Sequence, residues 1–327
     1  MLPIGITKDG AFTLASANPD DYVLRPGQLP EVEDNGTRII WPESAGSSEL
    51  WVSGDGADRS LGNVDVVFPI LHGPFGEDGT IQGMLELFGL PYVGSGVLAS
   101  SLGMDKHFTK TVLQAAGIEV APWRTIKRYD WHKRPQAIRA MAEQMPLPVF
   151  IKPARAGSSV GVGKVSNWDQ FAAAMDTAFL EDDHVLIEAG IVGREVECAV
   201  LQGMPGQPAR ASVDGEIVVS GREFYDFEAK YLGADGIDLV CPAALSADEL
   251  SELQRLSIRA FEAIDGAGLA RVDFFLTEHG FVLNEINTMP GFTPISMFPR
   301  CWQETGVSYP ELIDELIQVA LAHHAED

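Results

Sequence analysis

Residues 271–291, RVDFFLTEHGFVLNEINTMPG, constrain the fold more than any other stretch of this chain. Two short apolar runs flank residues 277–280, which is typical of a β-hairpin. The sequence predicts a three-residue loop of Glu278, His279 and Gly280, with Gly280 in the left-handed conformation. That register places Asp273 opposite Glu285.

Side chains alternate between the two faces of a strand, so Arg271 and Asp273 share one face, with Glu285 and Asn287 opposite them. Two carboxylates this close repel each other unless a cation lies between them. Oxygen ligands of this kind suit Mg²⁺, which completes its shell with phosphate and water. We expect a metal–phosphate site here. The alternative is an exposed hairpin whose polar face is only solvated.

The composition limits the possible partners. A chain of 327 residues is expected to form two or three domains. A net charge of −24 argues against nucleic-acid and anionic-membrane partners but not against a nucleotide. Cys198, Cys241 and Cys301 are far apart in sequence and are interpreted as reduced, mostly buried thiols of a cytoplasmic protein. No apolar run approaches 18 residues, and the N-terminus has no features of a signal peptide.

The pattern of elements predicts a mixed α/β fold with three domains, divided near residues 103 and 192. Residues 1–103 carry short apolar runs at 2–7, 65–71 and 90–95 around a helical stretch, which predicts a parallel sheet. Residues 104–191 begin with a helix over 105–116 and contain a strand over 148–154. Residues 192–327 add further strands, the hairpin and two helices.

A glycine-rich stretch, AGSSVGVGKV at 156–165, follows the strand that carries Lys152. Glycine and serine let the backbone approach a phosphate closely. The stretch is not a Walker A loop, because Lys164 is followed by valine, and it leads into a strand instead of a helix. We expect a β-turn-β flap over a phosphate. By itself, such a stretch is more often an ordinary turn.

Three further side chains are candidates for ligand binding. Glu188 ends an apolar run and Glu195 follows it, so these acids are expected to contact an adenine amino group and a ribose, unless they are ordinary loop acids. His72 lies in LHGPFGEDGT at 71–80, just before a helix, where anions and ligands bind in open α/β folds. A ligand role and a structural role are about equally favoured for this histidine.

Residues 223–231, EFYDFEAKY, have no clean helix or strand period. Their aromatic and charged side chains suit a lid that excludes water from an active site. Lys230 and Tyr231 would then reach into that site. Lys106, in GMDK, opens the helix predicted over 105–116 and would by itself be interpreted as a surface lysine.

Taken together, the motifs LHGPFGEDGTIQG, GMDK, FIKPARAGSSVGV, EFYDFEAKY, ARVDFF and NEINTMPGFTPISM resemble those of D-alanine–D-alanine ligases. The resemblance extends over essentially all of residues 1–327. It implies an ATP-grasp fold with an N-terminal doubly wound parallel-sheet domain, and a cytoplasmic homodimer. It also implies that ATP and two Mg²⁺ or Mn²⁺ ions support the joining of two D-alanines through an acyl phosphate, for peptidoglycan precursor synthesis.

The resemblance assigns roles to individual residues. Those that would bind ATP are Lys106, Lys152, Ser158, Ser159, Val160, Glu188, Ile191, Glu195 and Lys230. Asp273, Glu285 and Asn287 would hold the metal ions. The residues with catalytic roles would be Ser158, Tyr231, Arg271 and Gly291, with Arg271 and the backbone of Gly291 stabilising the oxyanion. The D-alanine sites would be formed by His72, Glu77, Tyr231 and Ser296.

Several alternatives stay open. The product could be D-alanyl-D-lactate or D-alanyl-D-serine, although Tyr231 favours the dipeptide. The family normally begins with a β-α unit that would lie before Met1, which raises the expectation of an upstream start or a truncated chain. A truncated chain would bind ATP and be impaired as a ligase. A zinc hydrolase using His72 is disfavoured, because no second histidine or cysteine lies at ligand spacing.

Overall fold

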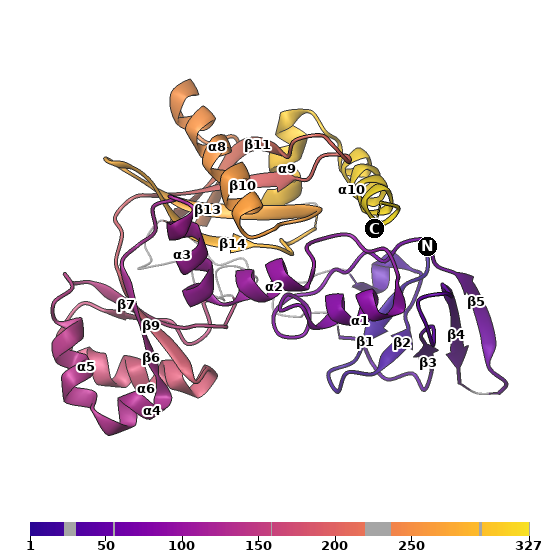
Figure 1. Cartoon of the computed structure of the whole chain (residues 1–327), viewed down its shortest axis with the longest axis horizontal. Helices are drawn as coiled ribbons and strands as arrows, with labels where there is room; N and C mark the ends of the chain where they lie inside the picture. The colour runs from indigo at the N-terminus through magenta and orange to yellow at the C-terminus, as the bar shows by residue number, and fades with distance from the viewer. Residues whose placement is uncertain (23–30, 55, 158, 220–236, 294–295, 327) are drawn as a thin grey trace.

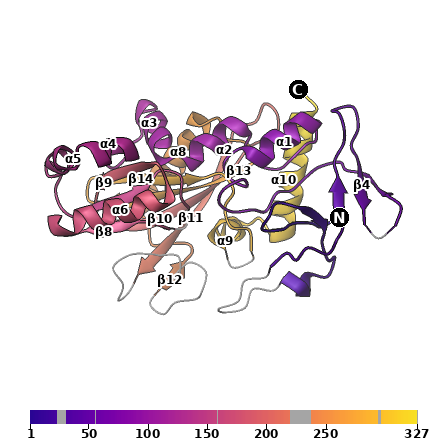
Figure 2. The ribbon, with the colours of Figure 1, turned by 90° about the horizontal axis from the view of Figure 1, so that it is seen from below.

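The computed structural model describes residues 1–327 apart from 23–30, 55, 158, 220–236, 294–295 and 327. The described elements fall into an N-terminal region, a central sheet and a C-terminal sheet (Figure 1). Both views place the helices of the central region and the strands of the N-terminal region at opposite ends of the molecule (Figure 2). Within the described residues, no helix has the length and apolar character needed to cross a bilayer.

The N-terminal region contains small antiparallel sheets. Strands β1 (Ile4–Ile6) and β2 (Phe12–Leu14) pair, and β3 (Arg38–Ile40), β4 (Glu49–Ser53) and β5 (Arg59–Asn63) form a three-stranded sheet. A 3₁₀ turn, η1, spans Pro19–Tyr22, and helices α1 (Thr80–Phe88) and α2 (Val97–Met104) follow. Trp41 joins the sheets to α1, because its ring lies 5.4 Å from Phe12 and 5.9 Å from Phe88.

The parallel sheet expected in this region is reduced in the described residues to one parallel bridge, between Val67 and Tyr92. The amide of Val67 donates to the carbonyl of Pro91, and the amide of Val93 donates to the carbonyl of Val67. The two runs are short, and Pro69 and Pro91 supply no N–H group to a ladder. The apolar runs therefore pack as extended segments without forming full strands.

Helix α3 (Lys106–Ala115) matches the predicted helix over 105–116. Asp105 caps its N-terminus by accepting from the amides of His107 and Phe108, as an N-cap aspartate does. Gly117 follows with a φ of 74°, which a glycine adopts readily after a helix. Figure 1 shows α3 between the central and C-terminal sheets.

The central sheet has the order β6-β9-β7-β8, and every pairing in it is antiparallel. Its strands are β6 (Trp123–Lys127), β7 (Val149–Pro153), β8 (Gly163–Val165) and β9 (His184–Ala189). Helices α4 (Arg128–Lys133), α5 (Pro135–Ala142) and α6 (Phe171–Glu181), the last preceded by the 3₁₀ turn η2 (Trp168–Gln170), pack on one face. Lys152 and Glu188 lie on the other face, because Phe150 pairs directly with Glu188 and Lys152 is two residues further on.

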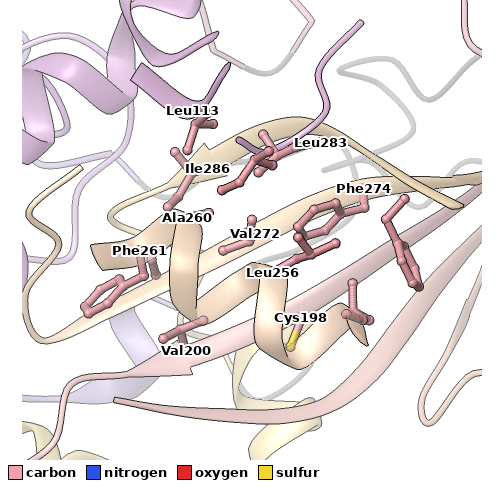
Figure 3. Packing of buried hydrophobic residues seen from close by; sticks show 14 of the residues in the cluster. Leu113, Cys198, Val200, Leu256, Ala260, Phe261, Val272, Phe274, Leu283 and Ile286 are labelled. Carbon is pink, nitrogen blue, oxygen red and sulfur yellow. The ribbon is translucent and has the colours of Figure 1, made fainter. Parts of the chain in front are cut away.

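The C-terminal sheet has the order β12-β11-β10-β13-β14. Its strands are β10 (Arg194–Leu201), β11 (Arg210–Val219), β12 (Ile237–Val240), β13 (Leu269–Thr277) and β14 (Gly280–Asn287). Helix α8 (Ala247–Ala263) covers one face, where its Leu256 and Phe261 share one buried cluster with Cys198, Val200 and Val272 of the sheet (Figure 3). Helices α9 (Met297–Thr305) and α10 (Tyr309–His324) pack on the opposite face.

The predicted hairpin is present, and its register at the predicted site is confirmed: Asp273 pairs with Glu285 and Arg271 with Asn287. The predicted loop was one residue too long. Thr277 pairs with Gly280, so the loop contains only Glu278 and His279, and Gly280 has a φ of 119°.

A β-bulge at Asn284 compensates for the shorter loop. Phe274 pairs with Leu283 while Asp273 pairs with Glu285, so Asn284 has no direct partner. The bulge lets Leu283 and Ile286 both enter the core beneath α8 (Figure 3). In the predicted register, with the longer loop and no bulge, Asn284 would pair with Phe274 and point into that core.

Candidate active site

The first cluster of charged residues lies on the face of the C-terminal sheet that α8 does not cover. Arg271 donates from Nε to Asp273 Oδ1 at 2.8 Å and from Nη2 to Asp273 Oδ2 at 2.7 Å. Its Nε also lies 3.3 Å from Glu197 Oε2. Burial lowers the pKa of Arg271, but Asp273 and Glu197 raise it well above its usual value. The guanidinium is therefore a fixed positive charge beside two carboxylates.

The donor set on β13 and β14 fits a hard divalent cation. Asp273 and Glu285 pair directly across the strands, and Asn287 lies two residues beyond Glu285 on the same face. Asp273 retains acceptor capacity after binding Arg271, because each carboxylate oxygen has two lone pairs. Across the described residues, no three His, Cys, Asp or Glu side chains form a metal-binding group by themselves. A site here therefore depends on the amide oxygen of Asn287 and on ligand oxygens, as is usual for Mg²⁺.

The second cluster is a buried ion triad between α3 and the central sheet. Lys152 Nζ lies 2.6 Å from Glu188 Oε1, and Lys110 Nζ lies 2.9 Å from Glu188 Oε2. Burial raises the pKa of Glu188, but the two ammonium groups outweigh it and lower that pKa to about 2. Burial lowers the pKa of Lys110, and the neighbouring Lys152 lowers it further. Sequence reasoning assigned Glu188 to the nucleotide, and the structure adds that both its oxygens contact lysines.

The glycine-rich stretch forms the predicted β-turn-β element, because β7 and β8 pair antiparallel from Val149–Val165 to Ile151–Gly163. Ser159 and Gly161 have positive φ values of 61° and 70°, and Val160 is exposed. Lys106 Nζ donates to the carbonyl of Ala156 at 2.7 Å. Lys106 therefore reaches the base of this turn from α3. Ser158 lies outside the described residues.

The residues predicted for adenine and ribose lie where the central sheet passes into the C-terminal sheet. Ile191 lies in the connection from β9 to β10 and is half-buried. Glu195 lies on β10 opposite Phe275, on the same face as Glu197. These positions form one border of the region between the two sheets.

Of the residues predicted for D-alanine, His72, Glu77 and Ser296 lie on two loops that touch. The amide of Leu71 donates to the sulfur of Met289 at 3.3 Å, which joins the loop of His72 to the loop after β14. His72 Nδ1 lies 3.9 Å from Glu77 Oε1, and Glu77 also accepts from the amide of Gly73. Next to this contact, a small apolar cavity lies between the two loops and is lined among others by Phe68, Leu71, Met289 and Phe292.

Gly291 and Ser296 lie side by side on the second loop. A Cβ atom at Gly291 would approach Ser296 Oγ to 3.0 Å, and Ser296 accepts from the amide of Thr293 at 3.1 Å. Ser296 is also the N-cap residue of α9. Lys230 and Tyr231, the predicted lid residues, lie outside the described residues.

Sequence reasoning missed Glu197 and Lys110. Both had a signal: Glu197 is two residues after Glu195 on the same strand face, and Lys110 is one helical turn after Lys106. The cysteines are free thiols, as interpreted, with Cys198 and Cys301 buried and Cys241 half-buried. The structure adds that Cys241 Sγ lies 3.7 Å from Cys301 Sγ, although 60 residues separate them. Their sequence spacing gave no sign of this pairing.

Family models match both ends of the chain: the D-ala D-ala ligase N-terminus over residues 1–95 and the D-ala D-ala ligase C-terminus over residues 112–318. A D-alanine–D-alanine ligase of Pseudarthrobacter chlorophenolicus is 49% identical over 325 residues, covering 98% of this chain and 85% of that protein. One from Mycobacterium bovis is 50% identical over 329 residues, covering 98% and 87%.

Solved structures agree with the sequence comparisons. The VanG D-Ala:D-Ser ligase from Enterococcus faecalis superposes with a TM-score of 0.82 at 33% identity, covering 98% of this chain and 89% of that chain. The D-alanine–D-alanine ligase from Coxiella burnetii gives a TM-score of 0.78 at 34% identity, covering 99% and 84%. The chain therefore belongs to the D-alanine–D-alanine ligase family, whose members are ATP- and magnesium-dependent ligases.

Proposed function

We propose that this chain joins two D-alanine molecules into D-alanyl-D-alanine at the expense of ATP, as a step of peptidoglycan precursor synthesis. The observation that carries the proposal is that this chain, a member of the family, contains both charged clusters. The triad of Lys110, Lys152 and Glu188 provides cations for a nucleotide. The hairpin with Asp273 and Glu285 provides oxygens for magnesium.

The first half of the reaction transfers the γ-phosphoryl group to the carboxylate of one D-alanine. Lys152 and Lys106 hold phosphate oxygens, and the turn with Ser158, Ser159 and Val160 covers them. Glu188, Ile191 and Glu195 border the nucleoside, with Lys230 at the γ-phosphate. Asp273, Glu285 and Asn287 hold the metal. Bound Mg²⁺ neutralises charge on the transferring phosphoryl group.

In the second half, the deprotonated amine of the second D-alanine attacks the carbonyl carbon of the acyl phosphate. The C–O bond to phosphate then breaks, the nitrogen loses a proton, and inorganic phosphate and the dipeptide are released. Arg271 donates to the oxygen that becomes negative, because it is a fixed cation held in place by Asp273 and Glu197. The amide of Gly291 is the second donor. His72, Glu77, Ser296 and Tyr231 orient the two D-alanines, and the lid excludes the water that would hydrolyse an acyl phosphate.

The test is phosphate release that depends on D-alanine, with the dipeptide identified by mass spectrometry. Lys152→Met is expected to lower kcat/KM for ATP by at least about 100-fold, because a charge-assisted contact to phosphate is lost. Lys133→Met is the matched control, since Lys133 lies on α4 and contacts Tyr129. ATP binding without D-alanine-dependent turnover would contradict the proposal and support a binding protein.

The likeness to a D-Ala:D-Ser ligase makes a D-alanine–D-serine or D-alanine–D-lactate ligase the second candidate. Competition between D-alanine, D-serine and D-lactate as acceptors separates the three products. An amine acceptor must be deprotonated and a hydroxy acid need not be, so D-lactate would gain on D-alanine as the pH falls.

The remaining expectations belong to the same proposal. The protein is expected to work in the cytoplasm as a homodimer with small-molecule substrates. Its three domains are expected to divide near residues 103 and 192. Light scattering coupled to gel filtration tests the dimer, and limited proteolysis tests the two boundaries. A monomeric mass at micromolar concentration would contradict the dimer.

A further inference from the structure

Lys110 is the buried lysine of the triad to which the two half-reactions above assign no contact with a substrate. Its side chain is 2% exposed, and its ammonium lies 2.9 Å from Glu188 Oε2. Lys152 contacts the other oxygen of the same carboxylate at 2.6 Å, and its side chain is 15% exposed. Burying an ammonium group is costly, so two lysines around one carboxylate need a physical reason.

The two lysines differ in what they can reach. Lys152 lies on β7 with its ammonium 5.8 Å from the ring centre of Phe150, at the partly open side of the triad. Lys110 lies on α3 beneath it and is closed off from solvent. Of this pair, Lys152 is therefore the lysine that can turn toward a phosphate.

Lys110 supplies a positive charge next to Glu188 when Lys152 turns away. Glu188 would keep its negative charge in a site that is 3% exposed. An unpaired carboxylate there would hold Lys152 in place or take up a proton. With Lys110 on the opposite oxygen, the carboxylate stays neutralised whether or not Lys152 contacts it.

Lys110 also links the two clusters. Glu285 on β14 adds to the electrostatic stabilisation of its ammonium, although less than Glu188 does. Lys106 precedes it by one turn of the same helix and reaches the carbonyl of Ala156 in the flap. One helix thus places two cations along the border of the nucleotide region.

We propose that Lys110 is a positioning residue for ATP binding: it keeps Glu188 neutralised when Lys152 turns away and so releases Lys152 to bind a nucleotide phosphate. The proposal rests on the function proposed above and refines it. Lys110 acts through Glu188 and Lys152 and contacts no substrate itself. Its removal should therefore affect the nucleotide and leave the D-alanine sites unchanged.

The experiment is a double-mutant cycle on the full chain with Lys110→Met, Glu188→Gln and the combined variant. Calorimetry measures the dissociation constant of a non-hydrolysable ATP analogue with Mg²⁺, and steady-state assays measure KM for ATP and for D-alanine. Lys110→Met is expected to weaken analogue binding about tenfold in the wild-type background and about twofold or less with Glu188→Gln present. KM for D-alanine should not change.

An equal loss of analogue affinity in both backgrounds would overturn the proposal, as would equal increases in KM for ATP and D-alanine. If Lys110→Met does not fold, Glu188→Gln and the combined variant remain comparable, because the combined variant buries no unpaired charge from this ion pair. A loss of about twofold or less between those two then supports the proposal, and a larger loss overturns it. Failure of the wild type to turn over D-alanine would instead contradict the proposed function, while the binding cycle would still report on Lys110.

Discussion

Arg271 and Glu188 show how charge is held at the residue scale. Arg271 is a half-buried cation and Glu188 a buried anion, and each has two partners of opposite sign: Asp273 and Glu197 for the guanidinium, Lys152 and Lys110 for the carboxylate. Doubling the partners keeps the ion charged in a site from which water is largely excluded. Such ions are aligned before a substrate arrives, which lowers the cost of reorganisation during reaction.

Arg271→Lys is expected to lower kcat by about 100-fold to 1,000-fold, because a lysine cannot hold Asp273 with two parallel bonds and still donate to an oxyanion. Arg255→Lys is the matched control: Arg255 also makes two bonds to a carboxylate, that of Glu252, but on the exposed surface of α8. Phosphate-release kinetics measure both. Equal activity of the two variants would exclude Arg271 from the chemistry.

Glu188 makes stability depend on pH in a definite direction. Its pKa in the folded protein is about 2, against an ordinary value of 4.5, because the attraction of Lys152 and Lys110 outweighs burial. A lowered folded pKa gives stability that is complete above the unfolded pKa and is lost as the pH falls toward the folded one. We expect Glu188 to contribute about 3 kcal/mol that disappears between pH 5 and pH 2.

Urea unfolding of the wild type and of Glu188→Gln over this range measures the contribution. The difference between their free energies of unfolding should shrink as the pH falls, since the glutamine does not titrate. A constant difference would show that the carboxylate is not paired in the folded state.

At the scale of elements, the flap depends on its backbone conformation. Gly161 has a φ of 70°, and a Cβ there would lie 2.8 Å from Glu181 Cγ and 2.9 Å from Pro153 Cγ. Gly157, in the same turn, has no positive φ, and a Cβ there would meet nothing within 4 Å. The turn therefore tolerates a side chain at Gly157, whereas a side chain at Gly161 would strain it.

Gly161→Ala is expected to raise KM for ATP by about 5-fold to 10-fold, because a left-handed alanine costs about 1 to 2 kcal/mol before any clash. Gly157→Ala should change KM for ATP by less than about twofold, since it meets no strain. Steady-state kinetics with varied ATP compare the two. Similar values for both variants would show that the turn does not shape the nucleotide site.

The elements also show what could be predicted from sequence. The pairing of Asp273 with Glu285 was predicted correctly, yet the loop length was wrong and the bulge at Asn284 was missed. The bulge is set by the need to bury Leu283 and Ile286 under α8, and that contact is tertiary. The ion pair of Lys110 with Glu188 was missed for the same reason: it joins a helix and a strand that are far apart in the sequence.

At the scale of the molecule, the N-terminal region meets the C-terminal sheet through close backbone contact. Gly268 has a φ of 65°, and a Cβ there would lie 2.7 Å from the backbone nitrogen of Gly94. The loops of His72 and Met289 touch nearby, through Leu71. The relative position of the two predicted D-alanine loops therefore depends on how closely these glycines approach.

Gly268→Ala is expected to raise KM for D-alanine by about tenfold while KM for ATP stays within about twofold, because the added methyl group separates the two loops but not the central sheet. Gly206→Ala is the matched control: Gly206 has a similar φ of 76° but open space at its Cβ. Any effect of backbone strain alone appears in both variants. An equal increase in KM for D-alanine in both variants would show that the increase comes from backbone strain and not from the contact between Gly268 and Gly94.

Helix α3 carries Lys106 toward the flap, Lys110 toward Glu188 and Leu113 into the C-terminal core. These three side chains lie on consecutive turns of one short helix. A change in the packing of Leu113 therefore tilts the helix and moves both lysines at once. Substitutions of Leu113 can therefore change the affinity for the nucleotide, although this aliphatic residue contacts neither substrate. Such substitutions could be selected during directed evolution. A screen limited to the pocket lining would overlook such variants.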